Sequence, residues 1–304
     1  MVGAGFGCEM NFDRSSRGRS SHVVLIPSYN TGARLFQTVA TIRRQEYPVW
    51  VVIDGSTDGT GDELCRIAEH DLDLQVFVLP RNQGKGAAVL HALQLAYGQG
   101  ITHVVTVDAD GQHSENDIDT FIAASQAHPE AMVLGIPIFD ESAPRIRVAG
   151  HRIAHVFADL VTLRAGIGNS LYGFRVYPVI PLLEVFSETR WMRRFDFDSE
   201  AAIRLSWRGV PVVNLRTPVR YFRREDGGVS HFKYLRDNIL LGFMYARLFA
   251  GLVARLPGLL KRRIMPRFRS SDPSAGLPPT SWLSPSRPSI AARCRNRWPP
   301  RGRP

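Results

Sequence analysis

The chain has 304 residues, of which 44% are hydrophobic and 22% are charged, so it can bury at least one full-sized core. This composition excludes a wholly disordered, collagen-like or disulfide-stapled protein. The net charge of +10 would suit a nucleic-acid-binding protein, but +7 of it belongs to residues 264–304. The rest of the chain carries only +3. It therefore lacks the basic groove that a nucleic-acid backbone requires, and we expect no nucleic-acid partner.

The cysteines and the start of the chain indicate the compartment. Cys8, Cys65 and Cys294 are far apart and lack metal-ligand spacing, which indicates free thiols in a reducing environment. Residues 1–20 are rich in Gly, Ser and Arg and lack the apolar core of a secretory signal. We expect a disordered N-terminal segment and a cytoplasmic protein.

Residues 21–141 alternate short β-branched apolar runs with longer helix-like segments. Continuous apolar strands between helices are typical of an α/β protein whose mostly parallel, Rossmann-like sheet is covered on both faces. Ligands bind at the carboxyl ends of the strands in such sheets. The expected strands are 22–26, 49–53, 75–79, 101–107 and 131–134, and the expected helices are 33–44, 60–70, 86–97 and 115–127.

Four polar, glycine-containing loops follow the first four expected strands. They are 27–30 (PSYN), 54–59 (DGSTDG), 80–86 (PRNQGKG) and 108–113 (DADGQH). Any one of them could be an ordinary turn. Because all four reach the same edge of the sheet, they predict a nucleotide or phosphate site.

Asp108 and Asp110 leave the end of an apolar strand two residues apart, so their carboxylates point the same way if the strand continues. Two oxygen ligands with open coordination positions suit Mg²⁺ or Mn²⁺ bridging a diphosphate, and Gln112 or His113 can add a ligand. The metal would neutralise charge on a departing nucleoside diphosphate. The alternative is that Asp110 only starts the next helix.

Asp54 and Lys85 are the other candidate binding residues. Asp54 precedes a turn of small residues, where its carboxylate can accept from a nucleobase or a ribose; an Asx-turn is the alternative. Lys85 lies between two glycines at a helix start, a place that favours anions. A solvated loop lysine is the alternative there.

These motifs, in this order and spacing, resemble glycosyltransferase family 2, and in particular its branch of dolichyl-phosphate mannose synthase and related polyprenyl-phosphate or lipid glycosyltransferases. The resemblance covers roughly residues 22–240. The stretches that carry it are 24–30 (VLIPSYN), 52–60 (VIDGSTDGT), 82–87 (NQGKGA) and 107–113 (VDADGQH), with later landmarks at 173–177 (GFRVY), 195–200 (FDFDSE), 218–219 (PV) and 228–232 (GVSHF).

The resemblance implies a GT-A fold over residues 21–230 and a metal-dependent, inverting transfer of a sugar from a UDP- or GDP-sugar to a lipid or polyprenyl-phosphate acceptor. By the same resemblance, the nucleotide sugar would be bound by Pro27, Tyr29, Asp54, Lys85 and Asp108, and the Mg²⁺ or Mn²⁺ by Asp108, Asp110 and Gln112. Phosphate of the donor or acceptor would be held by Arg145, Arg147, Arg152 and Arg175, because forked guanidinium groups suit phosphate.

The resemblance also implies an acid that deprotonates an acceptor hydroxyl, and both Asp198 and Glu200 fit. If the acceptor is a phosphate anion, no base is needed, and these acids are then helix N-cap groups. Two departures from the family pattern matter. Asp54 is preceded by Ile53 where the family usually has a second acid, and Asn169 and Tyr172 replace an Asp and a small residue, which leaves the acceptor's identity open.

Residues 239–260 are apolar except for Arg247 and Arg255. The segment is long enough to span a bilayer, but each central Arg costs about 2.5 to 3.5 kcal/mol on insertion. An arginine stripe opposite Leu240, Phe243, Phe249 and Leu252 predicts instead an amphipathic helix at 231–263 that lies in the membrane interface. A buried helix or a dimer contact is the alternative, so oligomerisation stays open.

Residues 264–304 contain nine prolines and are expected to be disordered. The protein would then lie peripherally on the inner face of the cell membrane.

Two other functions compete with the glycosyltransferase. A phosphohydrolase of the haloacid dehalogenase type shares the VDADG pattern but expects Thr or Val where Gln112 stands. A non-catalytic nucleotide-binding or membrane-adaptor protein would not need Asp108, Asp110 and an acid at 198 or 200.

Overall fold

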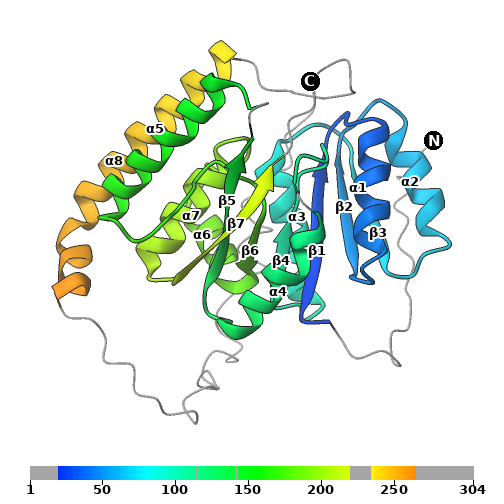
Figure 1. The fold of residues 1–304 in the computed structure, drawn as a ribbon, viewed down its shortest axis with the longest axis horizontal. Coiled ribbons are helices and arrows are strands. Elements are labelled where there is room, and N and C mark those ends of the chain that lie inside the picture. The colour runs from blue at the N-terminus through cyan, green and yellow to red at the C-terminus, as the bar shows by residue number, and fades with distance from the viewer. Residues whose placement is uncertain (1–19, 114, 141–142, 220–233, 265–304) are drawn as a thin grey trace, which may run out of the picture.

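The computed structural model describes residues 20–113, 115–140, 143–219 and 234–264. These residues form a seven-stranded sheet in the order β3-β2-β1-β4-β6-β5-β7 (Figure 1). Strand β6 is antiparallel to both of its neighbours, and the other neighbouring pairs are parallel. The strands are β1 (His22–Ser28), β2 (Val49–Asp54), β3 (Leu74–Leu79), β4 (His103–Thr106), β5 (Met132–Phe139), β6 (Arg175–Pro178) and β7 (Val212–Val219).

Helices cover both faces of the sheet. One face packs against α1 (Ala33–Arg43), α2 (Thr60–Ala68) and α4 (Ile118–Ala127), which follows a 3-10 turn (Glu115–Asp117). The other is covered by α3 (Lys85–Gly98), α5 (Arg145–Thr162), α6 (Val179–Glu188) and α7 (Phe197–Arg208), and α8 (Tyr234–Ile264) packs on α5 and α7. Strand β1 shows why its sequence is apolar throughout: Val23 and Leu25 enter one core, Val24 and Ile26 the other, and all four are buried.

The predicted α/β class is confirmed, and the expected strands and helices of the first half are present within a few residues of their predicted limits. The sequence predicts few helices or strands beyond residue 141. In the structure, β6 and β7 of this part complete the sheet, and α5 and α6 belong to the layer of helices on one of its faces. The expected disordered segments at 1–20 and 264–304, apart from residues 20 and 264, and the landmark at 228–232 lie outside the described residues.

The amphipathic helix expected at 231–263 is present as α8, which lies beside α5 at the edge of the molecule (Figure 1). Met244 and Leu248 are fully buried, whereas Phe243 and Phe249 face outward. Leu252 was expected on the outward face but is buried, because α8 packs on α7 as well as on α5. Within the described chain, residues Ile239–Lys261 of this helix are long and apolar enough to cross a membrane, which by itself is weak evidence that they do.

Candidate active site

The predicted convergence of the four loops is confirmed by a series of hydrogen bonds along the carboxyl edge of the sheet. Asn30, after β1, accepts through Oδ1 from the Thr57 amide after β2 at 2.7 Å. Asp54, at the end of β2, accepts from the amides of Gln83 and Gly84 after β3 at 2.8 and 2.7 Å. Three of the loops are therefore joined by hydrogen bonds, and the fourth is reached from the third, because Lys85 Nζ lies 2.6 Å from Asp108 Oδ1.

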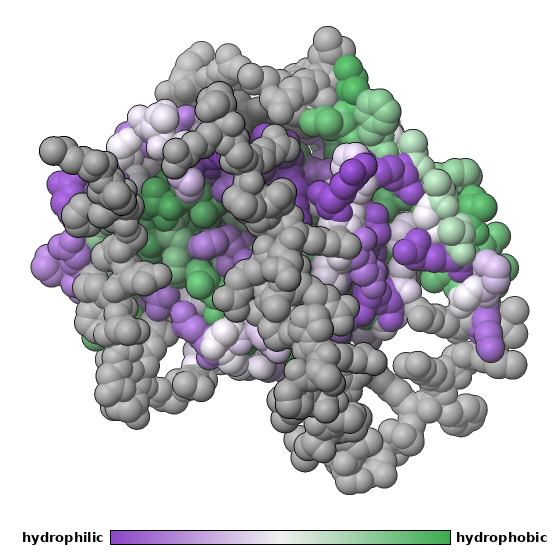
Figure 2. Space-filling view, turned by 180° about the vertical axis from the view of Figure 1, so that it is seen from behind, coloured by the Kyte–Doolittle hydropathy of each residue, from purple (hydrophilic) through white to green (hydrophobic). Residues whose placement is uncertain are grey.

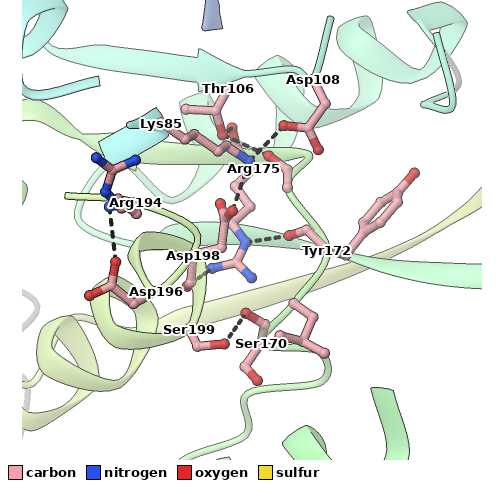
Figure 3. Close-up of polar contacts among 12 residues, drawn as sticks. Lys85, Thr106, Asp108, Ser170, Tyr172, Arg175, Arg194, Asp196, Asp198 and Ser199 are labelled. Atoms are coloured by element: carbon pink, nitrogen blue, oxygen red, sulfur yellow. Dashed lines mark hydrogen bonds and ion pairs between the residues drawn. The ribbon is translucent and has the colours of Figure 1, made fainter. Parts of the chain in front are cut away.

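Lys85 is the centre of the site (Figure 3). Its Nζ lies 2.6 Å from Asp108 Oδ1 and 2.7 Å from Asp198 Oδ2, so the ammonium group bridges the end of β4 and the first turn of α7. Burial alone would lower the pKa of Lys85, but the carboxylates of Asp108 and Asp198 raise it above its ordinary value. The lysine is therefore a fixed positive charge at the point where three elements meet.

Asp108 is held ionised by its neighbours. Burial alone would raise its pKa, but Lys85 and then His113 lower it well below the usual range. Its side chain keeps 32% of its surface exposed. A further ligand can therefore reach this carboxylate while it stays bonded to the protein.

Asp110 is the second carboxylate of the pair. Its Oδ1 accepts from the Gln112 amide at 3.0 Å, and burial and then the charge of Asp108 raise its pKa. Bringing a cation to this place would relieve both effects. No three His, Cys, Asp or Glu side chains of the described residues form a metal-binding group, so a metal here would have to take its remaining oxygen ligands from outside that set.

Two further features bear on a metal and a diphosphate. The missing side chain at Gly173 lets Asp108 and Lys85 approach the backbone, because a Cβ there would lie 2.4 Å from Asp108 Oδ2 and 2.6 Å from Lys85 Nζ. Asp198 Oδ1 is buried and has no hydrogen-bond partner among the described residues, which leaves an acceptor beside the lysine.

His113 was considered from the sequence only as an alternative to Gln112. Its Nε2 lies 3.2 Å from Asp108 Oδ2, and its Nδ1 is 3.2 Å from the Asp108 amide. The ring is 5% exposed and stacks on Phe174 at 5.6 Å between centroids. His113 therefore orients Asp108, and only its place in the DADGQH loop signalled this in the sequence.

Asp54 supports the loop that carries Lys85. It is 3% exposed, and burial raises its pKa despite the two amide hydrogen bonds. Pro27 pairs with Val52 near the end of β2, and Tyr29 follows β1 directly. The three residues assigned by resemblance to the nucleoside thus lie along one part of the edge.

Arg175 differs most from its expected place. The side chain is fully buried and donates to the Tyr172 carbonyl at 2.6 Å, to Tyr177 Oη at 2.8 Å and to the Asp198 carbonyl. Its donors therefore hold the segment before β6 and the start of α7 together. Because the side chain of Arg175 is fully buried, its guanidinium group has no exposed surface with which to bind a phosphate.

The three remaining arginines, Arg145, Arg147 and Arg152, lie on the first half of α5. Arg145 and Arg152 are exposed and Arg147 is half-buried. Since β5 runs in the same direction as β1 and β4, its carboxyl end and the start of α5 are at the site's edge of the sheet. The helix that carries these arginines therefore begins at the edge of the sheet that also holds Lys85.

Asp198 and Glu200 are separated by the fold. Asp198 contacts Lys85, whereas Glu200 is fully buried and bonded to Arg204 and Arg247, at 2.7 and 2.6 Å. Of the two candidates for the base, only Asp198 lies at the site.

A doubly covered, mostly parallel sheet whose strand ends carry a lysine among carboxylates defines an α/β protein with a charged candidate site at the carboxyl edge of its strands. The chain belongs to glycosyl transferase family 2, whose model matches residues 23–198, more than half of the chain. It is therefore a glycosyltransferase, and the predicted resemblance is confirmed. This assignment favours the glycosyltransferase over the phosphohydrolase and the non-catalytic adaptor.

Two curated relatives and one solved structure illustrate the similarity. The chain is 27% identical over 223 residues to glycosyltransferase GlyG of Streptococcus pneumoniae, covering 69% of this chain and 73% of the relative. It is 26% identical over 212 residues to polyprenol monophosphomannose synthase of Mycolicibacterium smegmatis, covering 67% and 78%.

The solved structure is glucosyl-3-phosphoglycerate synthase of Mycobacterium tuberculosis in complex with Mn²⁺, UDP-glucose and phosphoglyceric acid. It is 18% identical, with a TM-score of 0.51 over 77% of this chain and 79% of that one. At this identity the likeness concerns the fold, which is the expected GT-A fold.

Proposed function

We propose that the protein is a metal-dependent, inverting glycosyltransferase that moves a sugar from a UDP- or GDP-sugar to a polyprenyl-phosphate or other lipid-linked acceptor at the cytoplasmic face of the membrane. The observation that carries the proposal is the Lys85 ammonium held between Asp108 and Asp198 at the carboxyl edge of the sheet. A relative is named as a polyprenol monophosphomannose synthase, which supports the acceptor class.

Asp108 and Asp110 would hold Mg²⁺ or Mn²⁺, with Gln112 adjacent, because two neighbouring carboxylates are the hard ligands these ions prefer. The bound ion would supply neutralisation of the charge that develops on the leaving diphosphate. The solved structure named above contains Mn²⁺ and UDP-glucose, which supports the cofactor class without separating Mn²⁺ from Mg²⁺.

The chain's own residues would orient the reactants. Lys85 donates to a diphosphate oxygen, and Asp54 keeps its loop in place. The bond between the sugar C1 and the diphosphate oxygen breaks as the acceptor oxygen attacks C1 from the opposite side, which inverts the anomeric centre. Asp198 receives the proton of a hydroxyl acceptor; for a phosphate acceptor no proton is removed, and Asp198 then serves to hold Lys85. Arg145, Arg147 and Arg152 would bind the acceptor's phosphate, because forked guanidinium groups suit phosphate.

Membrane association is supported by an apolar surface on α5 and α8. Seen from behind, this surface forms the hydrophobic strip at the right edge of the molecule (Figure 2). Large exposed apolar patches mark interaction sites. The same two helices also carry exposed basic residues, Arg152 on α5 and Lys261 on α8. The exposed apolar side chains are Ile146, Ile153, Val156 and Leu160 of α5 and Ile239, Leu240, Phe243, Phe249, Val253 and Leu260 of α8.

The test is a transfer assay with the full chain and vesicles containing undecaprenyl phosphate. UDP-glucose, UDP-N-acetylglucosamine and GDP-mannose are offered with Mn²⁺, with Mg²⁺ or with EDTA. We expect one donor to give a lipid-linked, β-configured product with metal only, and Asp110→Asn to lower the rate at least about a hundredfold. The control is Asp62→Asn, an exposed aspartate in the first turn of α2. Absence of transfer from all three donors, or transfer undiminished in EDTA, would refute the proposal.

A further inference from the structure

Glu200 is a fully buried carboxylate outside the Lys85 site. Its Oε1 lies 2.7 Å from Arg204, one turn along the same helix, and its Oε2 lies 2.6 Å from Arg247 Nη2 on α8. A buried carboxylate persists only when it is paired, and removing one partner is strongly destabilising. The pairing with Arg247 therefore constrains where α8 lies against α7.

Arg247 contacts more than Glu200. Its Nη2 is 3.9 Å from Asp196 Oδ2, and its Cζ is 4.1 Å from the centroid of the Trp191 ring. Asp196 in turn accepts from the amides of Met192 and Arg194, which fixes the loop that leads into α7. The guanidinium group thus contacts the loop before α7 and the first turn of α7 together.

The direction of Arg247 corrects the expectation for α8. The sequence placed this arginine in the polar stripe of a helix lying in the membrane interface, but its side chain is only 23% exposed and points into the protein. The part of α8 that faces outward at this level is apolar and includes Phe243 and Phe249. One side of α8 is therefore held to α7 by an ion pair, and another side exposes apolar side chains that an apolar environment could cover.

The first turn of α7 carries two carboxylates with different partners. Asp198 and Glu200 are two residues apart, which corresponds to about 200° around a helix, so they point to opposite sides. Glu200 contacts Arg247 of α8, and Asp198 contacts Lys85. Because both carboxylates belong to the same helical turn, a shift of this turn on loss of the Arg247 contact would move Asp198 relative to Lys85 and Asp108.

We infer that Arg247 is a positioning residue for sugar transfer: by binding Glu200 and Asp196 it fixes the first turn of α7, and with it Asp198, to the membrane-facing helix α8. This inference rests on the proposed function, because its consequence is that Asp198 keeps a set distance from an acceptor held in the membrane. Arg247 does not touch the reactants.

The test compares Arg247→Met and Arg247→Lys with Arg255→Met. Arg255 lies two turns further along α8, and its Cζ stacks 5.0 Å above Trp207 at the other end of α7. Arg255→Met therefore removes the same charge and a similar aromatic contact from the same pair of helices. The measurements are kcat and KM for the donor in the vesicle assay, the melting temperature, and co-sedimentation with the vesicles.

Because misplacement by fractions of an ångström is costly at a reacting centre, we expect Arg247→Met to lower kcat about tenfold with little change in the donor's KM. Arg247→Lys keeps one ion pair but loses the planar fork, and its kcat should fall between those of Arg247→Met and the wild type. Arg255→Met should keep the kcat of the wild type. Co-sedimentation should stay unchanged in all three.

A wild-type kcat in Arg247→Met, an equal fall in Arg255→Met, or a loss of co-sedimentation that matches the loss of activity would overturn the inference alone. If Arg247→Met does not fold, a wild-type kcat in Arg247→Lys overturns it. A wild-type protein that transfers no sugar to the lipid would overturn the proposed function and this inference with it.

Discussion

Gly173→Ala tests the space at the centre of the site. The added Cβ would lie 2.4 Å from Asp108 Oδ2 and 2.6 Å from Lys85 Nζ, whereas ordinary contacts of this kind begin near 3.4 Å. The carboxylate and the ammonium must therefore each retreat by roughly 1 Å. Because both atoms end mobile side chains, the backbone need not move, and we expect the free energy of unfolding to fall by less than about 1 kcal/mol.

Activity should respond far more than stability. A 1 Å misplacement at a reacting centre costs about a hundredfold in rate, or about 2.7 kcal/mol of transition-state stabilisation. The assay is kcat/KM for transfer from the nucleotide sugar, with urea unfolding measured in parallel. The matched control is Gly98→Ala at the end of α3, where a Cβ meets nothing within 4 Å. A Gly173→Ala protein with wild-type kcat/KM would show that the Lys85 and Asp108 geometry is not the one used in transfer.

Three further predictions concern buried polar groups. Asp54→Asn replaces one of the two carboxylate oxygens that accept from the Gln83 and Gly84 amides with an amide donor, so one buried backbone N–H loses its acceptor. This should cost about 1 to 3 kcal/mol in urea unfolding, against no change for the exposed Asp62→Asn, and equal stabilities would contradict it. Arg175→Met leaves buried carbonyls without their donor and should lower the melting temperature by several degrees; an unchanged value would contradict it.

The third concerns pH. Burial and then His103 lower the pKa of His22 from 6.5 to about 4 in the folded protein. As pH falls, the His22 side chain is therefore protonated in the unfolded chain before it is protonated in the folded one. The free energy of unfolding should decrease between about pH 6.5 and pH 4, by at most about 3 kcal/mol. His22→Gln should flatten the slope of unfolding free energy over that range, and an unchanged slope would show that His22 does not titrate in this way.

The sequence was sufficient for the parts of the fold that depend on local pattern. Apolar runs such as 22–26 and 49–53 and the glycine loops after them are readable because each strand is buried on both faces and each loop needs special backbone geometry. Strand β6 has only four residues and pairs with β4 and β5 across the chain, so no local pattern indicates it.

The site was predictable to the level of residue type and loop, and not to the level of side-chain direction. Asp198 and Glu200 are both carboxylates and lie two residues apart in the sequence, and only the packing of α7 between Lys85 and Arg247 separates their environments. Arg175 carries the same charge as the arginines of α5, yet its neighbours Tyr172 and Tyr177 enclose it. Burial of a long side chain depends on tertiary contacts that composition does not record.

The reversed direction of β6 has a consequence for how specificity can change. An antiparallel strand begins where its neighbours end, so β6 delivers the residues before it, rather than those after it, to the reacting edge. The Gly173 carbonyl fastens this start to β4 by accepting from Thr106 at 2.9 Å. The segment between the end of α5 at Thr162 and Gly173 is therefore a loop with both ends anchored in the scaffold. The loop is also tied to the start of α7, because Arg175 donates to the carbonyls of both Tyr172 and Asp198 and Ser199 donates to the Ser170 carbonyl. A change in this loop would therefore act on the turn that carries Asp198 as well as on the reacting edge, so a new acceptor preference would have to keep these carbonyl contacts.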